Sequence, residues 1–185
     1  MNGRELLVGV SGGVAAFKAA ALVSQLVQAG AGVTVVLTDA GSEFVGEATF
    51  AALTGRPVAR QLFVPSIHPL GAHIELATRG ELFCVAPATA NFLAKAAHGF
   101  ADDLLSTLYL SFVGPVIMAP AMNCEMWEKP AVQRNVRQLR EDGVCFVDPV
   151  EGWLSCRRRG VGRMAAPETI AAAIAGHLPP TSRNT

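Results

Sequence analysis

Charged residues are scarce in this chain, and their signs cancel. Asp, Glu, Lys and Arg make up 16% of the 185 residues, and fifteen basic residues face fifteen acidic ones. A chain without net charge has no global field to attract nucleic acid or an anionic membrane, so we expect neither as a partner. The hydrophobic share of 51% is high for a soluble monomer and predicts that some surface is hidden in an oligomer.

Long apolar runs are also missing. Lys18, Ser24 and Gln25 interrupt the first long stretch, and no run reaches the ~18 residues of a membrane span. The first residues, Met-Asn-Gly-Arg-Glu, lead straight into a strand-like run and leave no room for a secretory signal peptide. We therefore expect a cytoplasmic protein.

The four cysteines show no CxxC spacing, and no Cys or His pair has the spacing of metal ligands, so no metal is expected. Cys84 and Cys145 lie in strand-like runs and are interpreted as small reduced core residues. The chain has neither a GxGxxG nor a Walker A motif, so ATP is not implied. No Ser/His/Asp triad or glycosidase-type carboxylate pair can be proposed from spacing.

Short apolar runs alternate with helix-like stretches, as in parallel strands buried on both faces. This order predicts a single-domain α/β fold over residues 1–178, with a doubly wound, Rossmann-like or flavodoxin-like parallel sheet. The polar, Pro-rich residues 179–185 predict a disordered tail. The expected strands are 6–10, 33–37, 82–86, 116–119 and 144–147, and the expected helices are 14–29, 43–54, 90–111 with a break near Gly99, 130–142 and 167–177.

Two segments, 63–80 and 148–165, contain turn residues without a clean period, which is typical of functional loops. The first contains His73, and the second contains Cys156 next to three arginines. His73 is either a structural histidine or a catalytic base, and Cys156 is either incidental in a basic loop or an acid carried on a mobile lid. The positive neighbourhood would lower the thiol pKa of Cys156.

Ser11-Gly12-Gly13 lies between the first strand and the first helix. Free backbone N–H groups and the positive helix end at such a turn suit a phosphate, although a tight turn without a ligand has the same sequence. Thr89 likewise either only caps the helix that begins near Ala90 or also contacts a ligand together with Asn91. Asp103 is expected to cap the second half of a broken helix.

Asn123 directly follows the apolar run 116–119. Ligands of open α/β sheets lie at the carboxyl ends of strands, so Asn123 is placed at a site, unless it is only a turn residue before a Met/Trp cap of the core.

Five motifs in this order and spacing resemble the homo-oligomeric flavin-containing cysteine decarboxylases, over residues from about 5 to 178. They are Ser-Gly-Gly-Val-Ala, His73, Pro-Ala-Thr-Ala-Asn, Pro-Ala-Met-Asn-Cys-Glu-Met-Trp and Cys-Arg-Arg-Arg-Gly-Val-Gly-Arg-Met.

The resemblance implies FMN bound between subunits of a homotrimer or dodecamer, with its phosphate near Ser11 and Gly12. It also implies that Asn123 and Met126 contact the substrate. That substrate would be 4'-phosphopantothenoylcysteine of coenzyme A synthesis, with His73 as the active histidine and Cys156 as the proton donor. The further FMN contacts it implies are Gly13, Val14, Thr38, Phe44, Thr89, Ala90 and Asn91.

The chain departs from the family pattern after Cys156, where Arg157, Arg158 and Arg159 replace a more usual Gly-acidic-x sequence. This difference bears on the conformation and closing of the loop. The alternatives are a flavin prenyltransferase, a peptidyl-cysteine decarboxylase or a non-catalytic phosphatase-regulating relative of the same fold. Many bacterial relatives are fused to a synthetase domain, and this chain ends before one.

Overall fold

Each strand of the central sheet carries apolar side chains toward both faces, which is why the sheet is covered by helices on both sides. The computed structural model describes residues 1–64 and 69–178. The strands of the main sheet are β1 (Glu5–Val10), β2 (Gly32–Leu37), β3 (Leu82–Ala88), β4 (Val116–Pro120) and β5 (Cys145–Phe146). In β1, Leu6 and Val8 pack into one core cluster while Leu7 packs into the other.

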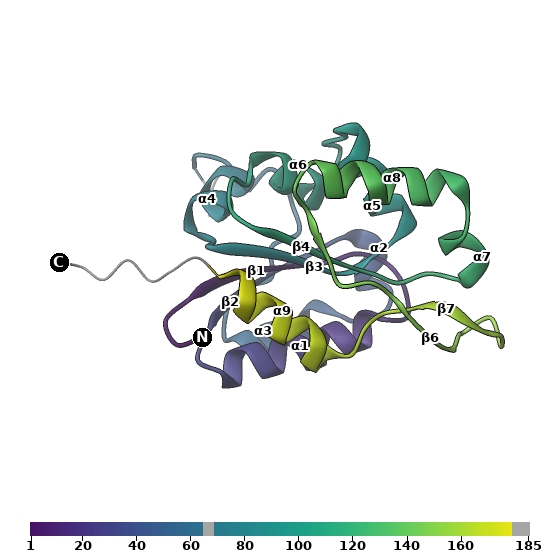
Figure 1. Ribbon diagram of the computed structural model, residues 1–185. Coiled ribbons are helices and arrows are strands. Elements are labelled where there is room, and N and C mark those ends of the chain that lie inside the picture. Colours follow the sequence, from purple (N-terminus) through teal and green to yellow (C-terminus); the bar gives the residue numbers. More distant parts are fainter. Residues whose placement is uncertain (65–68, 179–185) are drawn as a thin grey trace.

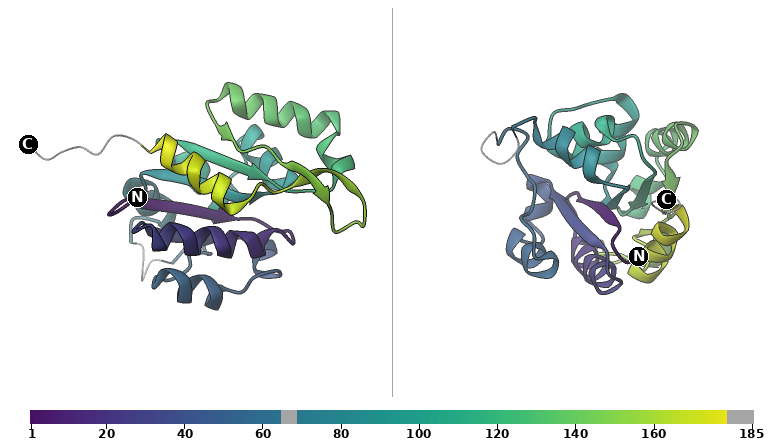
Figure 2. Two further views of the ribbon diagram at one scale, coloured as in Figure 1. Left: turned by 60° about the horizontal axis from the view of Figure 1, so that its bottom comes forward. Right: turned by 90° about the vertical axis from the view of Figure 1, so that its left-hand side faces the viewer.

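All pairings within this sheet are parallel, and the strand order is β2-β1-β3-β4-β5. The helices are α1 (Ala16–Gln28), α2 (Asp39–Ser42), α3 (Glu47–Thr54), α4 (Ala72–Arg79), α5 (Ala90–His98), α6 (Leu104–Ser111), α7 (Cys124–Trp127), α8 (Pro130–Glu141) and α9 (Pro167–His177). One face of the sheet is covered by α1, α3 and α9 and the other by α4, α5, α6 and α8 (Figure 1). The right-hand view of Figure 2 shows the sheet end-on, with helices on both sides of it. The prediction of a doubly wound, flavodoxin-like α/β fold is confirmed.

The structure also confirms the predicted end of one helix, the break in another and one helix cap. Gly55 and Gly99 end α3 and α5 with φ of 65° and 70°, a left-handed conformation that favours glycine. The expected break near Gly99 separates α5 from α6, and Asp103 caps α6 by accepting a hydrogen bond from the Ser106 amide at 2.8 Å.

The edge strand β2 is covered by the segment after α3. Ala59 forms a parallel bridge with Val36, donating its N–H to the Val35 carbonyl and accepting from the Leu37 amide, both at 2.9 Å. At the other edge, the guanidinium of Arg140 lies 5.2 Å from the ring centre of Phe146 in β5.

The structure corrects the interpretation of the two irregular segments. Within 63–80 a helix forms, α4. Its residues Ala72 and Leu76 are one turn apart, so both lie on the same face of the helix and are buried there. Within 148–165 two antiparallel strands form, β6 (Val150–Trp153) and β7 (Arg159–Arg163), in a sheet of their own. The helix expected over 43–54 is shorter, because Gly46 begins α3 after the separate turn α2. The predicted tail, 179–185, lies outside the described residues.

Candidate functional site

A cavity of about 700 Å³ opens at the carboxyl edge of the sheet, in the size range of cofactor sites. It lies beside the neighbouring strands β1 and β3, where the strand order reverses, which is the topological switch point of such sheets. Of the residues predicted to bind a ligand, it is lined by Ser11, Gly12, Gly13, Thr38, Phe44, Thr89, Ala90, Asn91 and Met126.

Ser11 links the loop after β1 to the loop after β3, both of which line this cavity. Its hydroxyl donates to the Pro87 carbonyl at 2.7 Å and accepts from the Thr89 amide at 3.1 Å. Thr89 in turn caps α5 by accepting from the Phe92 amide at 3.2 Å. The loop after β1 and the loop after β3 are thereby held in register, so the amino ends of α1 and α5 share one site.

The loop before α1 presents backbone donors. Among the described residues, none accepts a hydrogen bond from the N–H groups of residues 12–15. A methyl group on Gly12 would lie 2.7 Å from Cβ of Ala40, so only glycine allows this close approach of loop and α2. These donors at the positive end of a helix suit an anion such as a phosphate. Val14 is more than half exposed and does not line the cavity.

Thr38 and Phe44 frame another side of the cavity. Thr38 caps α2, accepting from the Gly41 amide at 3.0 Å, which fixes the turn that carries Phe44. The Phe44 side chain is 53% exposed although it lines the cavity. An aromatic surface left open at a cavity mouth is suited to cover a planar ring.

Asn123 is both a helix cap and a neighbour of the cavity. Its Oδ1 accepts from the amides of Glu125 at 2.7 Å and Met126 at 3.4 Å, which starts α7. Both lone pairs of that oxygen are therefore used, and its NH₂ group is left as the donor for a ligand. Asn123 itself does not line the cavity, whereas Met122 and Met126 on either side of it do. Asn123 can therefore cap α7 with its oxygen and still contact a ligand with its NH₂ group.

Cys156 lies at the exposed tip of the β6–β7 hairpin and does not line the cavity. The hairpin projects beside α7 (Figure 1), and Met122 donates its N–H to the Gly162 carbonyl at 2.9 Å. Two of the three arginines after Cys156 are paired, Arg158 with Glu125 and Arg159 with Glu151. Gly162 is buried and anchors β7, so the tip extends from a fixed base.

His73 is not brought to the cavity. It lies in the first turn of α4 rather than in a loop, and α4 is at the opposite end of the molecule from α7 and the hairpin in Figure 1. Its Nδ1 is buried without a hydrogen-bond partner among the described residues. Within one chain the predicted catalytic pair His73 and Cys156 is therefore not assembled.

The cavity wall also contains charged residues that were not predicted from the sequence as part of the site. Arg60 bonds Asp39 at 2.7 Å and Glu47 at 2.5 Å. Lys95 lies 2.7 Å from carboxylates of both Asp102 and Asp103. Desolvation by itself would lower the pKa of Lys95, but the hydrogen bonds to Asp102 and Asp103 outweigh it. The pKa is raised overall, so the ammonium stays charged. The Lys95 contacts could have been anticipated from the predicted break between two helices, whereas nothing in the sequence links Arg60 to Asp39.

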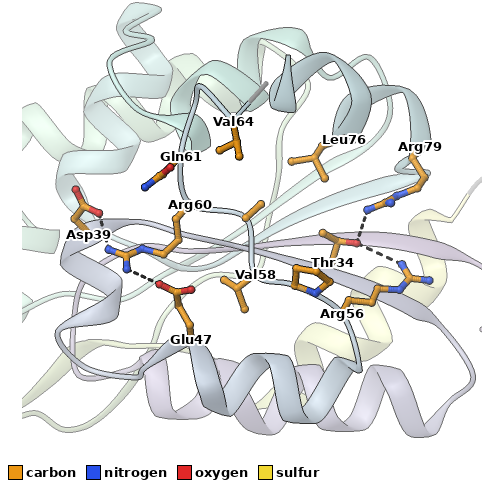
Figure 3. A pocket seen from close by; sticks show the side chains of 12 residues that line it. Thr34, Asp39, Glu47, Arg56, Val58, Arg60, Gln61, Val64, Leu76 and Arg79 are labelled. Atoms are coloured by element: carbon orange, nitrogen blue, oxygen red, sulfur yellow. Dashed lines mark hydrogen bonds and ion pairs between the residues drawn. The ribbon is translucent and has the colours of Figure 1, made fainter. Parts of the chain in front are cut away.

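A second cavity, of about 630 Å³, lies between the segment 56–64 and α4, on the other side of the Arg60–Asp39 pair. Figure 3 shows Arg60 reaching Asp39 and Glu47, while Arg56 and Arg79 are both directed at Thr34. The Thr34 hydroxyl accepts from Arg79 at 2.8 Å and from Arg56 at 3.3 Å. The guanidinium groups that line this second cavity thus have protein partners, whereas the first cavity lies at the topological switch point of the sheet. We therefore take the first cavity as the candidate site.

The remaining cysteines behave as expected for packing. Burial raises the pKa of Cys84 to about 12, so this thiol stays protonated, and Cys145 packs half-buried against the same core. Within residues 1–64 and 69–178, no cluster of three or more potential ligands could hold a metal ion. Over the same residues, none of the helices combines the length and hydropathy needed to cross a membrane.

The fold and the cavity define a flavodoxin-like α/β protein with a cofactor-sized site at its switch point. The chain belongs to the Flavoprotein family, whose model matches residues 1–178. It is similar to the coenzyme A biosynthesis bifunctional protein CoaBC of Bacillus subtilis, with 46% identity over 92% of this chain and 42% of that protein. For CoaBC of Mycobacterium bovis the identity is 44%, over 90% of this chain and 40% of that protein. The chain thus spans less than half the length of these relatives.

Two solved structures share the fold closely. The FMN-dependent cysteine decarboxylase SpaF has a TM-score of 0.81 and 34% identity, covering 95% of this chain and 97% of that one. A cysteine-to-serine mutant of PPC decarboxylase complexed with pantothenoylaminoethenethiol has a TM-score of 0.85 and 28% identity, covering 93% and 96%.

Proposed function

We propose that this chain is an FMN-dependent decarboxylase that converts 4'-phosphopantothenoylcysteine to 4'-phosphopantetheine in coenzyme A biosynthesis. The observation that carries the proposal is the cavity at the switch point, where the loop before α1, the cap of α5 and the start of α7 meet. The relatives of coenzyme A biosynthesis at 40–46% identity support this substrate over a peptidyl cysteine. The proposal includes a cytoplasmic location, where a thiol such as Cys156 stays reduced.

The residues of the cavity fit FMN. The phosphate would accept from the free N–H groups of residues 12–15, and glycine at position 12 lets this loop pack closely against Ala40 of α2, where any side chain would collide. Thr89, Ala90 and Asn91 would approach from α5, and Phe44 would cover the ring system. When bound, FMN supplies the two-electron oxidation of the cysteinyl thiol that permits loss of CO2, and it returns the electrons afterwards.

The chain's own residues would bind and protonate. The NH₂ group of Asn123 would donate to the substrate carboxylate or amide, because its Oδ1 is committed to the α7 cap. Met126, 46% exposed at the cavity, would contact the acyl chain. Cys156 would give a proton to the enethiol left after CO2 loss. The related PPC decarboxylase structure, a cysteine-to-serine mutant holding pantothenoylaminoethenethiol, supports a cysteine in the step after the enethiol.

A second subunit would complete the site. His73 lies in α4, at the opposite end of the molecule from the hairpin in Figure 1. Val14 directly follows the cavity residue Gly13, and Val14 and Phe17 are 55% and 61% exposed. Exposed apolar side chains around an incomplete site favour an assembly in which a neighbour covers the cavity. We propose a homotrimer, or a dodecamer of such trimers, in which His73 of one subunit serves the site of the next.

Mass spectrometry tests the reaction directly. The purified protein, loaded with FMN, should convert 4'-phosphopantothenoylcysteine with loss of CO2 and should leave a peptide ending in cysteine unchanged. Conversion of the peptide alone would favour a peptidyl-cysteine decarboxylase, and a protein that binds no FMN would remove the proposal. Asn123→Asp is an informative variant because Asp is an equally good helix cap. It should retain the fold and FMN but lose turnover, since a carboxylate repels the substrate carboxylate.

Subunit complementation tests the shared site. Chains carrying His73→Gln and chains carrying Asn123→Asp should each be inactive, but co-expression should recover activity in mixed oligomers, where some sites contain both intact residues. Failure of recovery in oligomers shown to be mixed would place His73 and Asn123 in the same chain's site or outside it. Light scattering should show a trimer or a multiple of it.

A further inference from the structure

Two cysteines of the hairpin region lie on facing elements. Cys156 is exposed at the tip between β6 and β7, and Cys124 is the first residue of α7, against which β7 packs. Cys124 is not among the residues that line the cavity. Both are free thiols in the structure.

Three contacts fasten β7 to α7. Met122 donates to the Gly162 carbonyl, Arg158 forms an ion pair with Glu125, and Gly160 packs against Cys124. A methyl group on Gly160 would lie 2.8 Å from Cβ and 3.1 Å from Sγ of Cys124. The Cys124 thiol therefore points at the backbone of the hairpin rather than at solvent alone.

The ion pair joins the two elements close to both thiols. Cys124 is adjacent to Glu125, and Cys156 is two residues, or ~7 Å of extended backbone, from Arg158. The pKa of Cys124 is raised by desolvation first, then by Glu125, and also by the Cys156 thiol nearby. A disulfide needs Cα atoms ~5.5 Å apart, a separation that bending of the exposed tip can reach.

We propose that Cys124 and Cys156 form a reversible disulfide that takes the hairpin thiol out of use when the protein meets an oxidising small disulfide. The cross-link itself depends only on the placement of the two cysteines. Its effect on turnover rests on the proposed function, in which Cys156 is the proton donor.

The exchange proceeds in two balanced steps. The Cys156 thiolate attacks a low-molecular-weight disulfide, forming a mixed disulfide and releasing one thiolate. The Cys124 thiol, after losing its proton, attacks the Cys156 sulfur and releases the second thiolate. Overall, two protein thiols are oxidised to one disulfide while the small disulfide is reduced to two thiols. The tether favours this second step because it is intramolecular, with an effective concentration in the mM range.

Oxidised glutathione is the probe for the test, used on the whole FMN-loaded protein after reduction and removal of the reductant. The wild type should lose two hydrogens in intact mass without keeping a glutathione adduct, and its turnover should disappear in proportion and return fully with dithiothreitol. Cys124→Ser should instead keep glutathione on Cys156. Before oxidation this variant should turn over at the wild-type rate, since residue 124 lies outside the cavity.

Cys145→Ser is the matched control. Trypsin leaves Cys145 and Cys156 on one peptide, because no Lys or Arg lies between Arg140 and Arg157, so a link from Cys124 to that peptide is ambiguous in the wild type. In Cys145→Ser the link must still form if it joins Cys124 to Cys156.

Three results would overturn the inference: a stable glutathione adduct on wild-type Cys156, loss of the link in Cys145→Ser, or a link only between two chains on a non-reducing gel. These readouts do not depend on turnover. A cross-linked protein that never decarboxylates would reject the proposed function and leave the disulfide intact, whereas an active enzyme that does not cross-link would reject the disulfide alone.

Discussion

Gly162 is the point where the hairpin meets the body of the protein, and Gly162→Ala tests whether that contact positions the hairpin for catalysis. The added methyl would lie 2.3 Å from the Met122 carbonyl oxygen, a backbone atom that cannot swing aside. Strand β7 would have to withdraw by about 1 Å to restore a contact distance of ~3.5 Å. The hydrogen bond from the Met122 amide to Gly162, 2.9 Å long, would be lost or weakened with it.

The expected energies separate function from stability. Overpacking of this size costs ~1–3 kcal/mol and the lost hydrogen bond ~1 kcal/mol, and the hairpin can relieve most of this by moving outward. The hairpin forms a two-stranded sheet of its own, separate from the main sheet, so the cooperative unfolding transition should change little. Turnover is more sensitive, because a misplacement of ~1 Å can cost ~100-fold in rate. FMN affinity should be unchanged, since Gly162 does not line the cavity.

Three measurements check this: kcat from product formation by mass spectrometry, the Kd of FMN by fluorescence titration, and the thermal midpoint of unfolding. Gly176→Ala is the control, because a methyl there in α9 meets nothing within 4 Å. It should leave turnover unchanged and stabilise the helix by up to ~1 kcal/mol. Normal kcat in Gly162→Ala would refute the positioning role of the hairpin, and loss of FMN would mean that the hairpin shapes the cavity itself.

Three further predictions follow from the same structure. Gly12→Ala brings a methyl within 2.7 Å of Ala40 and should yield a colourless protein on purification; a yellow protein would contradict the assignment of the loop before α1. His73→Gln should abolish turnover while FMN stays bound, and near-normal kcat would make His73 structural. The hydrogen bond from Arg56 holds the pKa of Glu5 below its ordinary value, so this carboxylate stabilises the fold at neutral pH and the stabilisation is lost as pH falls through that lowered pKa. Urea unfolding should therefore show Glu5→Gln less stable than the wild type at pH 7 and equally stable at a pH below that lowered pKa; a constant difference would exclude the ionised pair as its cause.

The main sheet could be predicted because its strands are continuous apolar runs such as Leu6 to Val10, which only burial on both faces explains. The loop at Ser11 and the caps Thr89 and Asp103 could be predicted because each acts within a few residues of a strand or helix end.

The hairpin could not be predicted, because neither strand is an apolar run: β6 contains Glu151 and Gly152, and β7 places glycine and arginine on both sides of Val161. The helix α4 could not be predicted because it is short. Its two buried residues, Ala72 and Leu76, span a single turn and give no measurable hydrophobic period. The pairing of Arg60 with Asp39 across 21 positions depends on tertiary structure alone.

The bridge between Ala59 and Val36 has a consequence for how this chain associates. By occupying the hydrogen-bonding groups of Val35 and Leu37, it removes the template that an exposed strand edge offers to a second chain. Strand-by-strand growth, which is open-ended and leads toward fibrils, is therefore blocked at β2. At this edge, copies of the chain that associate have to meet through side chains, and contacts of that kind can close into finite, symmetric particles.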